Sequence, residues 1–379
     1  AAWSSDDAFW TVAVDAPEGE FTFTCGFFLG CSGYYDYARG HAPDFAGAAA
    51  FAGRIVHPQF WPDDLDVAGK RVVVIGSGAT AVTLVPAMAK TAAHVTMLQR
   101  SPSHIVNRPS ENALAQRLQR YLPAHLAYGV TRWAVILESM LLYRLARKRP
   151  QLVGKRIAAM AAQQLGPGVD VATHFTPAYK PWDQRVCVVP DGDLFCAIRE
   201  GRASVATDEI ERFTPSGLQL KSGRELQADI VVTATGLRMH ILGGIAVGVD
   251  GVPFKASEAM SYKGMMLSDL PNCAMTFGYT NASWTLKADL TAAYVCRLLR
   301  YMDRHGLAIA VARRAPDVEP RPFLSFTSGY VQRAHDLLPR QGSRRPWQVY
   351  QNYLQDLVTI RFGRVADGVM RFGARGAMP

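Results

Sequence analysis

The sequence has few cysteines and no paired cysteine motif. Its 379 residues contain six scattered cysteines: Cys25, Cys31, Cys187, Cys196, Cys273 and Cys296. None of them forms a C-x-x-C pair and no secretory signal precedes them, so no disulfide framework is indicated. We expect reduced, mostly buried cysteines, no metal site and a cytoplasmic location.

Long apolar runs and nucleic-acid-binding patterns are also missing. No stretch reaches the ~18 apolar residues of a membrane-spanning helix, and the nearest, 133–146, contains Glu138 and Arg144. No Lys/Arg tract is interleaved with aromatic residues, so no nucleic-acid partner is expected. The 41 basic and 32 acidic residues give a net charge of +9, which favours anionic ligands such as nucleotide phosphates or an acidic membrane surface.

A glycine-rich turn is the clearest positive signal. The apolar run 72–75 is typical of a buried parallel strand, and it ends in Gly76, Ser77, Gly78, Ala79, Thr80 and Ala81. The first glycine permits a tight turn, the second lets backbone approach a pyrophosphate, and Ala81 lets the next helix pack closely. A helix-compatible segment, 79–90, and a second strand, 94–99, follow. We predict a dinucleotide site at 76–81, with a bare structural turn as the alternative.

The residues after the second strand indicate which dinucleotide binds. An Asp or Glu at this point would bind an NAD ribose, but the chain has Arg100 and Ser101. A guanidinium beside a hydroxyl suits a 2′-phosphate through charge-assisted hydrogen bonds. The sequence therefore favours NADP(H) over NAD, unless Arg100 is merely a solvated residue at a strand end.

The segment 111–165 is predicted to be a helical insertion. Apolar residues recur at helical spacing in two stripes, made of Leu114, Leu118 and Leu122 and then of Trp133, Leu137, Met140, Leu141 and Leu145. Basic residues between 144 and 156 accompany the second stripe. A solvated basic face is the simpler interpretation, and peripheral contact with an anionic membrane surface is the alternative.

A second motif precedes the glycine turn. Phe51-x-Gly53-x-x-x-His57-x-x-x-Trp61 matches the F-x-G-x-x-x-H-x-x-x-W/P fingerprint, and with the glycine turn that follows it the chain resembles the Baeyer–Villiger and flavin-containing monooxygenases. It looks closest to the ethionamide-activating subgroup, and the resemblance covers essentially the whole chain.

The resemblance implies an α/β fold with two doubly wound, Rossmann-like dinucleotide-binding domains, the NADP domain being inserted in the FAD domain. The expected boundaries are 1–50 for the remainder of the FAD domain, 51–69 for the fingerprint linker, 70–228 for the NADP domain and 229–379 for the return to the FAD domain.

The resemblance also assigns residues to roles. His57 would couple domain movement to catalysis, although it could equally be a hydrogen-bonded linker residue. Arg185 matches an arginine beside the flavin that stabilises a peroxide anion, with a structural ion pair to Asp183 or Asp191 as the rival reading. Thr235 and Gly236 match a turn close to cofactor, whereas Gln184 replaces a lysine that helps many relatives hold the NADP phosphate.

The implied activity is that of an FAD- and NADPH-dependent monooxygenase. Through a C4a-peroxyflavin it would use O₂ to oxygenate a small hydrophobic ketone, or sulfur in thioethers and thioamides. Alternatives are an N-hydroxylating flavin monooxygenase, a flavin-dependent disulfide reductase, which the fingerprint argues against, and a truncated NADP-binding remnant without catalysis. No Gly-x-Gly-x-x-Gly turn precedes Trp10, so we expect an N-terminally truncated sequence that binds FAD poorly by itself.

Overall fold

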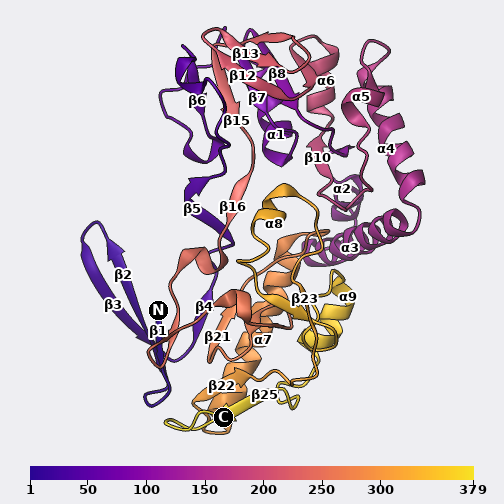
Figure 1. Ribbon diagram of the computed structural model, residues 1–379. Helices are drawn as coiled ribbons and strands as arrows, with labels where there is room; N and C mark the ends of the chain where they lie inside the picture. Colours follow the sequence, from indigo (N-terminus) through magenta and orange to yellow (C-terminus); the bar gives the residue numbers. More distant parts are fainter. The chain divides into compact units, whose positions relative to one another are not determined.

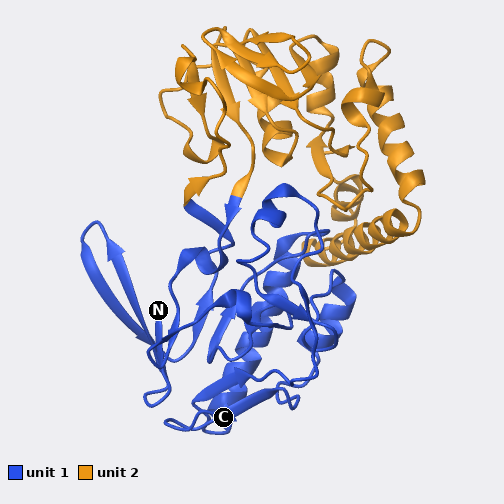
Figure 2. Cartoon of the chain, in the orientation of Figure 1, with its two compact units in different colours: residues 1–37, 238–379 blue, residues 38–237 orange.

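The computed structural model describes all residues, 1–379, and the chain divides into two units. Unit 1 consists of Ala1–Tyr37 together with Arg238–Pro379, and unit 2 is the continuous segment Ala38–Leu237 (Figure 2). The predicted boundaries 51–69 and 228–229 both lie inside unit 2. The assignment of a cofactor to each domain stays a prediction.

Unit 2 contains a five-stranded parallel sheet (Figure 1). Its spatial order is β11-β8-β7-β15-β6, and every neighbouring pair in it is parallel. The strands are β6 (Arg54–Val56), β7 (Arg71–Ile75), β8 (His94–Gln99), β11 (Ala203–Thr207) and β15 (Ile230–Thr233). The two strands predicted at 71–75 and 94–99 are confirmed.

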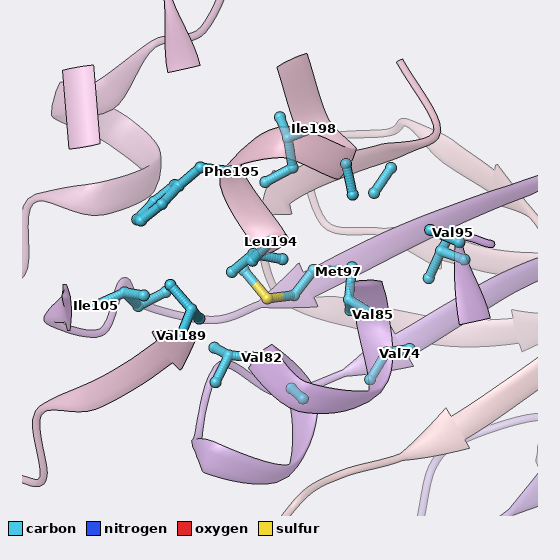
Figure 3. Close-up of a cluster of buried hydrophobic side chains, with 14 of the residues drawn as sticks. Val74, Val82, Val85, Val95, Met97, Ile105, Val189, Leu194, Phe195 and Ile198 are labelled. Carbon is cyan, nitrogen blue, oxygen red and sulfur yellow. The ribbon is translucent and has the colours of Figure 1, made fainter. Parts of the chain in front are cut away.

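An apolar core joins this sheet to two of its helices (Figure 3). Helix α1 (Ala79–Met88) follows β7, and α6 (Asp193–Arg199) precedes β11. Val74, Val85, Met97 and Leu194 are all fully buried in the same cluster. Such strands are buried on both faces, which explains their unbroken apolar runs.

The predicted insertion is helical. It consists of α2 (Ala113–Gln119), α3 (Ala124–Lys148) and α4 (Pro150–Leu165), and the short α5 (Val171–Phe175) follows it. The Asn112 side chain caps α2 by accepting the Ala115 N–H at 3.0 Å, and Gly166, with φ 79°, ends α4. The parallel pair β9 (Ile105–Arg108) and β10 (Cys187–Pro190) was not predicted from the sequence.

A small antiparallel sheet completes unit 2. It is formed by β12 (Ile210–Thr214), β13 (Gly217–Leu220) and β14 (Glu225–Gln227). Phe213, Leu218 and Leu226 from these strands share a buried cluster with Val73 of β7. This cluster lies on the strand face opposite to Val74 because side chains alternate along a strand.

Unit 1 is built from small sheets and one long helix. A hairpin near the N-terminus consists of β2 (Phe9–Ala16) and β3 (Gly19–Cys25), paired from Trp10 with Cys25 to Ala16 with Gly19. Helix α7 (Trp284–Arg304) is the longest helix of the unit. The other helices and strands are β1 (Ala2–Ser4), β4 (Phe28–Gly30), β5 (Tyr35–Gly40), which continues into unit 2, β16 (Leu237–Met239), β17 (Gly248–Val249), β18 (Val252–Pro253), β19 (Ser261–Tyr262), β20 (Met266–Leu267), β21 (Cys273–Met275), β22 (Ile309–Ala312), β23 (Pro320–Pro322), α8 (Gly329–Arg333), β24 (Arg340–Gly342), α9 (Tyr353–Asp356) and β25 (Met370–Gly373).

Buried charges hold α7 to the C-terminal segment of unit 1. Lys287 pairs with Asp356 at 2.8 Å, and both side chains are 3% exposed. Tyr279 donates a second hydrogen bond to Asp356 at 2.7 Å. Farther along, Lys263 pairs with Asp367 at 3.0 Å. Desolvation lowers the pKa of the Lys287 ammonium, and the Asp356 carboxylate opposes this effect.

Two further sequence expectations concern membranes and cysteines. None of the helices has both the length and the apolar content needed to cross a membrane. All six cysteines are free thiols, but only Cys187 and Cys273 are buried, whereas Cys31 and Cys296 are exposed. The expectation of mostly buried cysteines is therefore wrong, because four of the six lie at or near the protein surface.

Candidate functional site

The glycine turn lies where the strand order of the parallel sheet reverses. The chain leaves β7 toward β8 and β11 on one side, whereas β15 and β6 lie on the other. Ligands of open α/β sheets bind outside the carboxyl ends of the strands at such a reversal. Gly76, directly after β7, has φ +132°, and a Cβ there would stand 2.4 Å from the Ala234 carbonyl oxygen at the end of β15. Only glycine allows these two strand ends to approach so closely.

The far end of the turn is open. Gly78 precedes the first residue of α1, is exposed, and would direct a Cβ into empty space. Ala79 and Thr80 are exposed as well, whereas Ala81 is fully buried beneath the helix. The first N–H groups of a helix have no partner within the helix and attract anions. The arrangement can accept a pyrophosphate at Gly78.

Ser77 connects the turn to the segment after β8. Its hydroxyl lies 2.8 Å from the Ser103 hydroxyl and donates to the Ser101 carbonyl at 3.3 Å. Ser103 in turn hydrogen-bonds to Tyr179, and His104, which is buried, contacts the Tyr179 carbonyl through Nε2 at 3.0 Å. Sequence reasoning missed Ser103, His104 and Tyr179 because they carry no motif and only the fold brings them together.

Arg100 is exposed at the end of β8. Nearby Glu209 is engaged by Lys221 at 2.6 Å, and this hydrogen bond, aided by the charge of Arg100, holds the pKa of Glu209 below its usual range. The preceding residue, Gln99, is buried and donates to the His174 carbonyl at 2.8 Å and to Thr207 at 2.9 Å. These hydrogen bonds fix Gln99 and so orient the backbone of the next residue, Arg100.

Two of the fingerprint residues have structural roles. Phe51 is buried and packs edge-on against Phe213, with ring centroids 5.8 Å apart. A Cβ at Gly53 would lie 2.3 Å from the Asp229 carbonyl oxygen. These residues therefore fix the entry of the fingerprint segment against the edge of the sheet. Trp61, by contrast, is partly exposed at 38%.

His57 lies against the two chain segments that lead out of unit 2. Its Nδ1 accepts the Gln59 N–H at 3.2 Å, so the ring hydrogen is assigned to Nε2, which faces the Gly236 carbonyl at 3.4 Å. A Cβ at Gly40 would stand 2.0 Å from the His57 ring. Gly40 ends β5, and Gly236 precedes β16.

Thr235 and Gly236 take part in the same local structure. The Thr235 hydroxyl donates to the His41 carbonyl, and the His41 N–H donates to the Gly236 carbonyl at 3.1 Å. Gly236 has φ +107°, which favours glycine. The structure therefore brings His57, Thr235 and Gly236 together, and their polar groups form hydrogen bonds with neighbouring segments of the same chain. Contact of Thr235 or Gly236 with a cofactor stays a prediction.

Arg185 is exposed in the segment that leads into β10. Asp183, one proposed partner, accepts a hydrogen bond from Arg147 at 2.6 Å, and Asp191, the other, accepts the Ser110 N–H at 3.0 Å. Cys187 donates its thiol to the Ser77 carbonyl at 3.8 Å, and burial raises the pKa of that thiol to about 11, against the opposing charge of Arg185. Through this hydrogen bond the segment that carries Arg185 touches the glycine turn.

A parallel sheet with a glycine turn at its strand reversal defines a dinucleotide-binding α/β protein. The chain belongs to the flavin-binding monooxygenase-like family, whose model matches residues 4–240. It is 52% identical over 379 residues to the FAD-containing monooxygenase EthA of Mycobacterium tuberculosis (strain H37Rv). The alignment covers 100% of this chain and 78% of that protein. It is 50% identical to EthA of Mycolicibacterium smegmatis, over 98% of this chain and 76% of that protein.

The fold is similar to that of oxidized steroid monooxygenase bound to NADP. The TM-score is 0.72 at 17% identity, over 98% of this chain and 79% of the other. This likeness confirms the predicted α/β class with two Rossmann-type domains.

Proposed function

We propose that this chain is an NADPH-dependent flavin monooxygenase that oxygenates small hydrophobic ketones, or sulfur in thioethers and thioamides. Membership of the family supports a flavin monooxygenase. The name of the M. tuberculosis relative supports FAD, and the NADP bound to steroid monooxygenase supports NADP(H).

The observation that carries the proposal is the open turn from Gly76 to Ala81 followed by exposed Arg100. The turn offers Gly78 and the first N–H groups of α1 to a pyrophosphate. Arg100 follows the neighbouring strand, at the position that selects between the two nicotinamide dinucleotides. A guanidinium there favours the 2′-phosphate of NADP(H).

The chemistry divides between the cofactor and the chain. Bound FAD supplies the activation of O₂. Arg185 contributes a permanent positive charge, which stabilises negative charge that develops beside the substrate. His57 contacts Gly40 and Gly236, and the chain segments that contain these glycines lead into unit 1. Through these contacts His57 would couple a movement of the two units to turnover.

The first experiment compares NADPH and NADH oxidation by the protein supplied with FAD. Arg100→Ala should raise the KM for NADPH by about tenfold or more and leave that for NADH unchanged, because two charge-assisted hydrogen bonds are lost. Arg212→Ala, at an exposed arginine of β12 in the same unit, is the matched control. Equal use of the two dinucleotides by the parent protein would contradict the NADP assignment.

The second experiment identifies the oxygenated product from a panel of ketones, thioethers, thioamides and primary amines under labelled O₂. Arg185→Ala should reduce labelled ester or sulfoxide by about 100-fold while NADPH oxidation continues, and Arg185→Lys should recover part of it. Hydroxylated amines would favour the N-hydroxylating alternative. NADP binding without any O₂ consumption would identify a non-catalytic remnant.

Contact with a membrane surface is a separate proposal, which depends on one helix of unit 2 and not on the nucleotide site.

A further inference from the structure

Helix α3 exposes a continuous apolar stripe. At about 100° per residue, five large side chains fall within roughly 80° of its circumference and extend over about 22 Å of its length. They are Leu126, Val130, Trp133, Leu137 and Leu141, and all are exposed. The two most exposed are Leu137 at 52% and Leu141 at 67%. Exposed apolar residues scattered singly are ordinary, but a stripe of this length marks an interaction surface.

The stripe is not the face that packs α3 onto its own unit. The buried residues of the helix are Ala127, Ile136 and Ala146, and each projects at least about 40° outside the stripe. The stripe is therefore an apolar surface that the packing of α3 onto unit 2 leaves exposed. A contiguous exposed apolar surface is typical of a site that a partner or a membrane covers.

The charges of α3 indicate what covers it. Arg144 and Lys148 continue the line of the stripe toward the helix C-terminus and are both exposed. The helix contains four basic residues, Arg132, Arg144, Arg147 and Lys148, and one acidic residue, Glu138. Glu138 is paired with Arg108 at 2.9 Å. Arg147 is paired with Asp183 at 2.6 Å. The surface therefore joins an apolar stripe to the positive charges of Arg144 and Lys148, which are complementary to anionic lipid headgroups.

We propose that α3 binds the surface of an anionic lipid bilayer, lying in the interface with Leu137 and Leu141 inserted and with Arg144 and Lys148 among the headgroups. Trp133 takes the interfacial position that tryptophan favours. This contact is peripheral, because no helix is fit to span the bilayer, and it is independent of the proposed monooxygenase activity.

The test is flotation of the full chain with two kinds of vesicle, one of phosphatidylcholine alone and one containing phosphatidylglycerol in equal part. The chain should float with the anionic vesicles and not with the neutral ones, and high salt should weaken the binding. Leu137→Ser/Leu141→Ser should lower the partition coefficient at least about tenfold. Arg144→Gln/Lys148→Gln should lower it by about fivefold for each charge removed.

Matched controls separate this surface from general effects. Leu337→Ser changes a 55% exposed leucine of unit 1, and Arg300→Gln/Arg304→Gln removes two exposed charges at the same spacing from α7. Both should bind as the parent does. Trp133 fluorescence should shift to the blue on vesicle binding, and Trp133→Phe should remove that part of the signal.

Three outcomes would overturn the proposal: no flotation with anionic vesicles, equal flotation with neutral ones, or equal losses in the controls. Self-association that Leu137→Ser/Leu141→Ser abolishes, without any vesicle binding, would instead assign the stripe to a second copy of the chain. Circular dichroism and thermal unfolding establish that each variant is folded.

Discussion

The two units achieve stability in different ways. Unit 2 is formed by one continuous segment of the chain around a parallel sheet. Its largest core cluster consists of aliphatic and aromatic side chains with one cysteine. Unit 1 assembles two segments that are distant in sequence, and it contains the buried charges Lys263, Lys287 and Asp356. Unit 1 also has an apolar cluster that joins its two segments, with Trp3 and Trp10 from the first and Leu267 from the second. Its buried charges therefore add directional contacts to an apolar core.

The sharpest way to break this comparison is to remove one buried charge from unit 1. Lys287→Met should lower the free energy of unfolding by about 3–5 kcal/mol, because it leaves Asp356 buried without its cation. Lys287→Met/Asp356→Leu should recover much of that loss. Chemical denaturation measures both.

The control for that prediction is an exposed pair in unit 2. Arg71→Met removes the partner of Asp229, and the two side chains are 49% and 35% exposed. Its cost should be no more than about 1 kcal/mol. Similar losses for the buried and the exposed pair would contradict the contrast between the units.

A cavity in unit 2 should be almost as costly as the missing charge in unit 1. Leu194→Ala removes a fully buried side chain between α6 and the sheet (Figure 3) and should cost about 2–5 kcal/mol. Leu114→Ala, on the exposed surface of α2, should leave the unfolding free energy nearly unchanged. Because the core is apolar, the loss should not depend on salt; a strong salt dependence would argue against an apolar origin.

The two glycines of the turn sharpen the comparison within unit 2. Gly76→Ala should cost about 1–3 kcal/mol of stability, because its φ is positive and its Cβ would strike the Ala234 carbonyl. Gly78→Ala should be stable, because its Cβ meets no atom, but it should weaken NADPH binding. Calorimetry of unfolding and of NADPH binding distinguishes the two. If Gly78→Ala lost stability but kept its affinity for NADPH, we would conclude that the ligand binds away from the turn.

The smallest effect concerns the pH dependence of unit 2. Hydrogen bonds from the Arg71 side chain and backbone lower the pKa of Asp229 from 3.8 to about 2. Because the folded pKa is the lower one, the stabilisation is fully present above about pH 4 and is lost as the pH falls toward 2. Its size should stay below about 1 kcal/mol, since Asp229 is 35% exposed.

Asp229→Asn tests this by removing the ionisable group. Acid unfolding of the variant should have a shallower dependence on pH between 4 and 2 than that of the parent. Asp64→Asn, at a pair with Arg54 in which the Asp64 side chain is 77% exposed, should change the dependence less, because solvent screens that pair. An identical slope in all three proteins would show that Asp229 does not contribute.

Much of unit 2 could be predicted because its signals are local. The run 71–75, the turn that follows and the strand 94–99 lie next to each other in the chain, and each obeys a short-range rule. The strands β9 and β10 were missed because each is short and needs the other, from about eighty residues away in sequence, for its hydrogen bonds. The same holds for Ser103 and Tyr179, which support the turn from distant positions.

Unit 1 depends more on tertiary structure. The Asn272 amide donates to the Gly26 carbonyl at 2.6 Å and to the Ala308 carbonyl at 2.8 Å, so one side chain joins segments from both parts of the unit. No sequence pattern marks Asn272, because an isolated asparagine is typical of a surface turn. Its role follows only from the burial that surrounds it.

The sequence by itself determined the strand, the glycine turn and the next strand, the fingerprint and the family, because these depend on residue type at short, regular spacing. Only the tertiary structure decided that His57 lies on Gly40 beside Gly236, that Phe51 and Gly53 serve packing, and that the apolar stripe of α3 stays exposed. Hydrophobic periodicity shows that a helix has an apolar face, but whether that face is covered depends on which distant residues the fold brings against it.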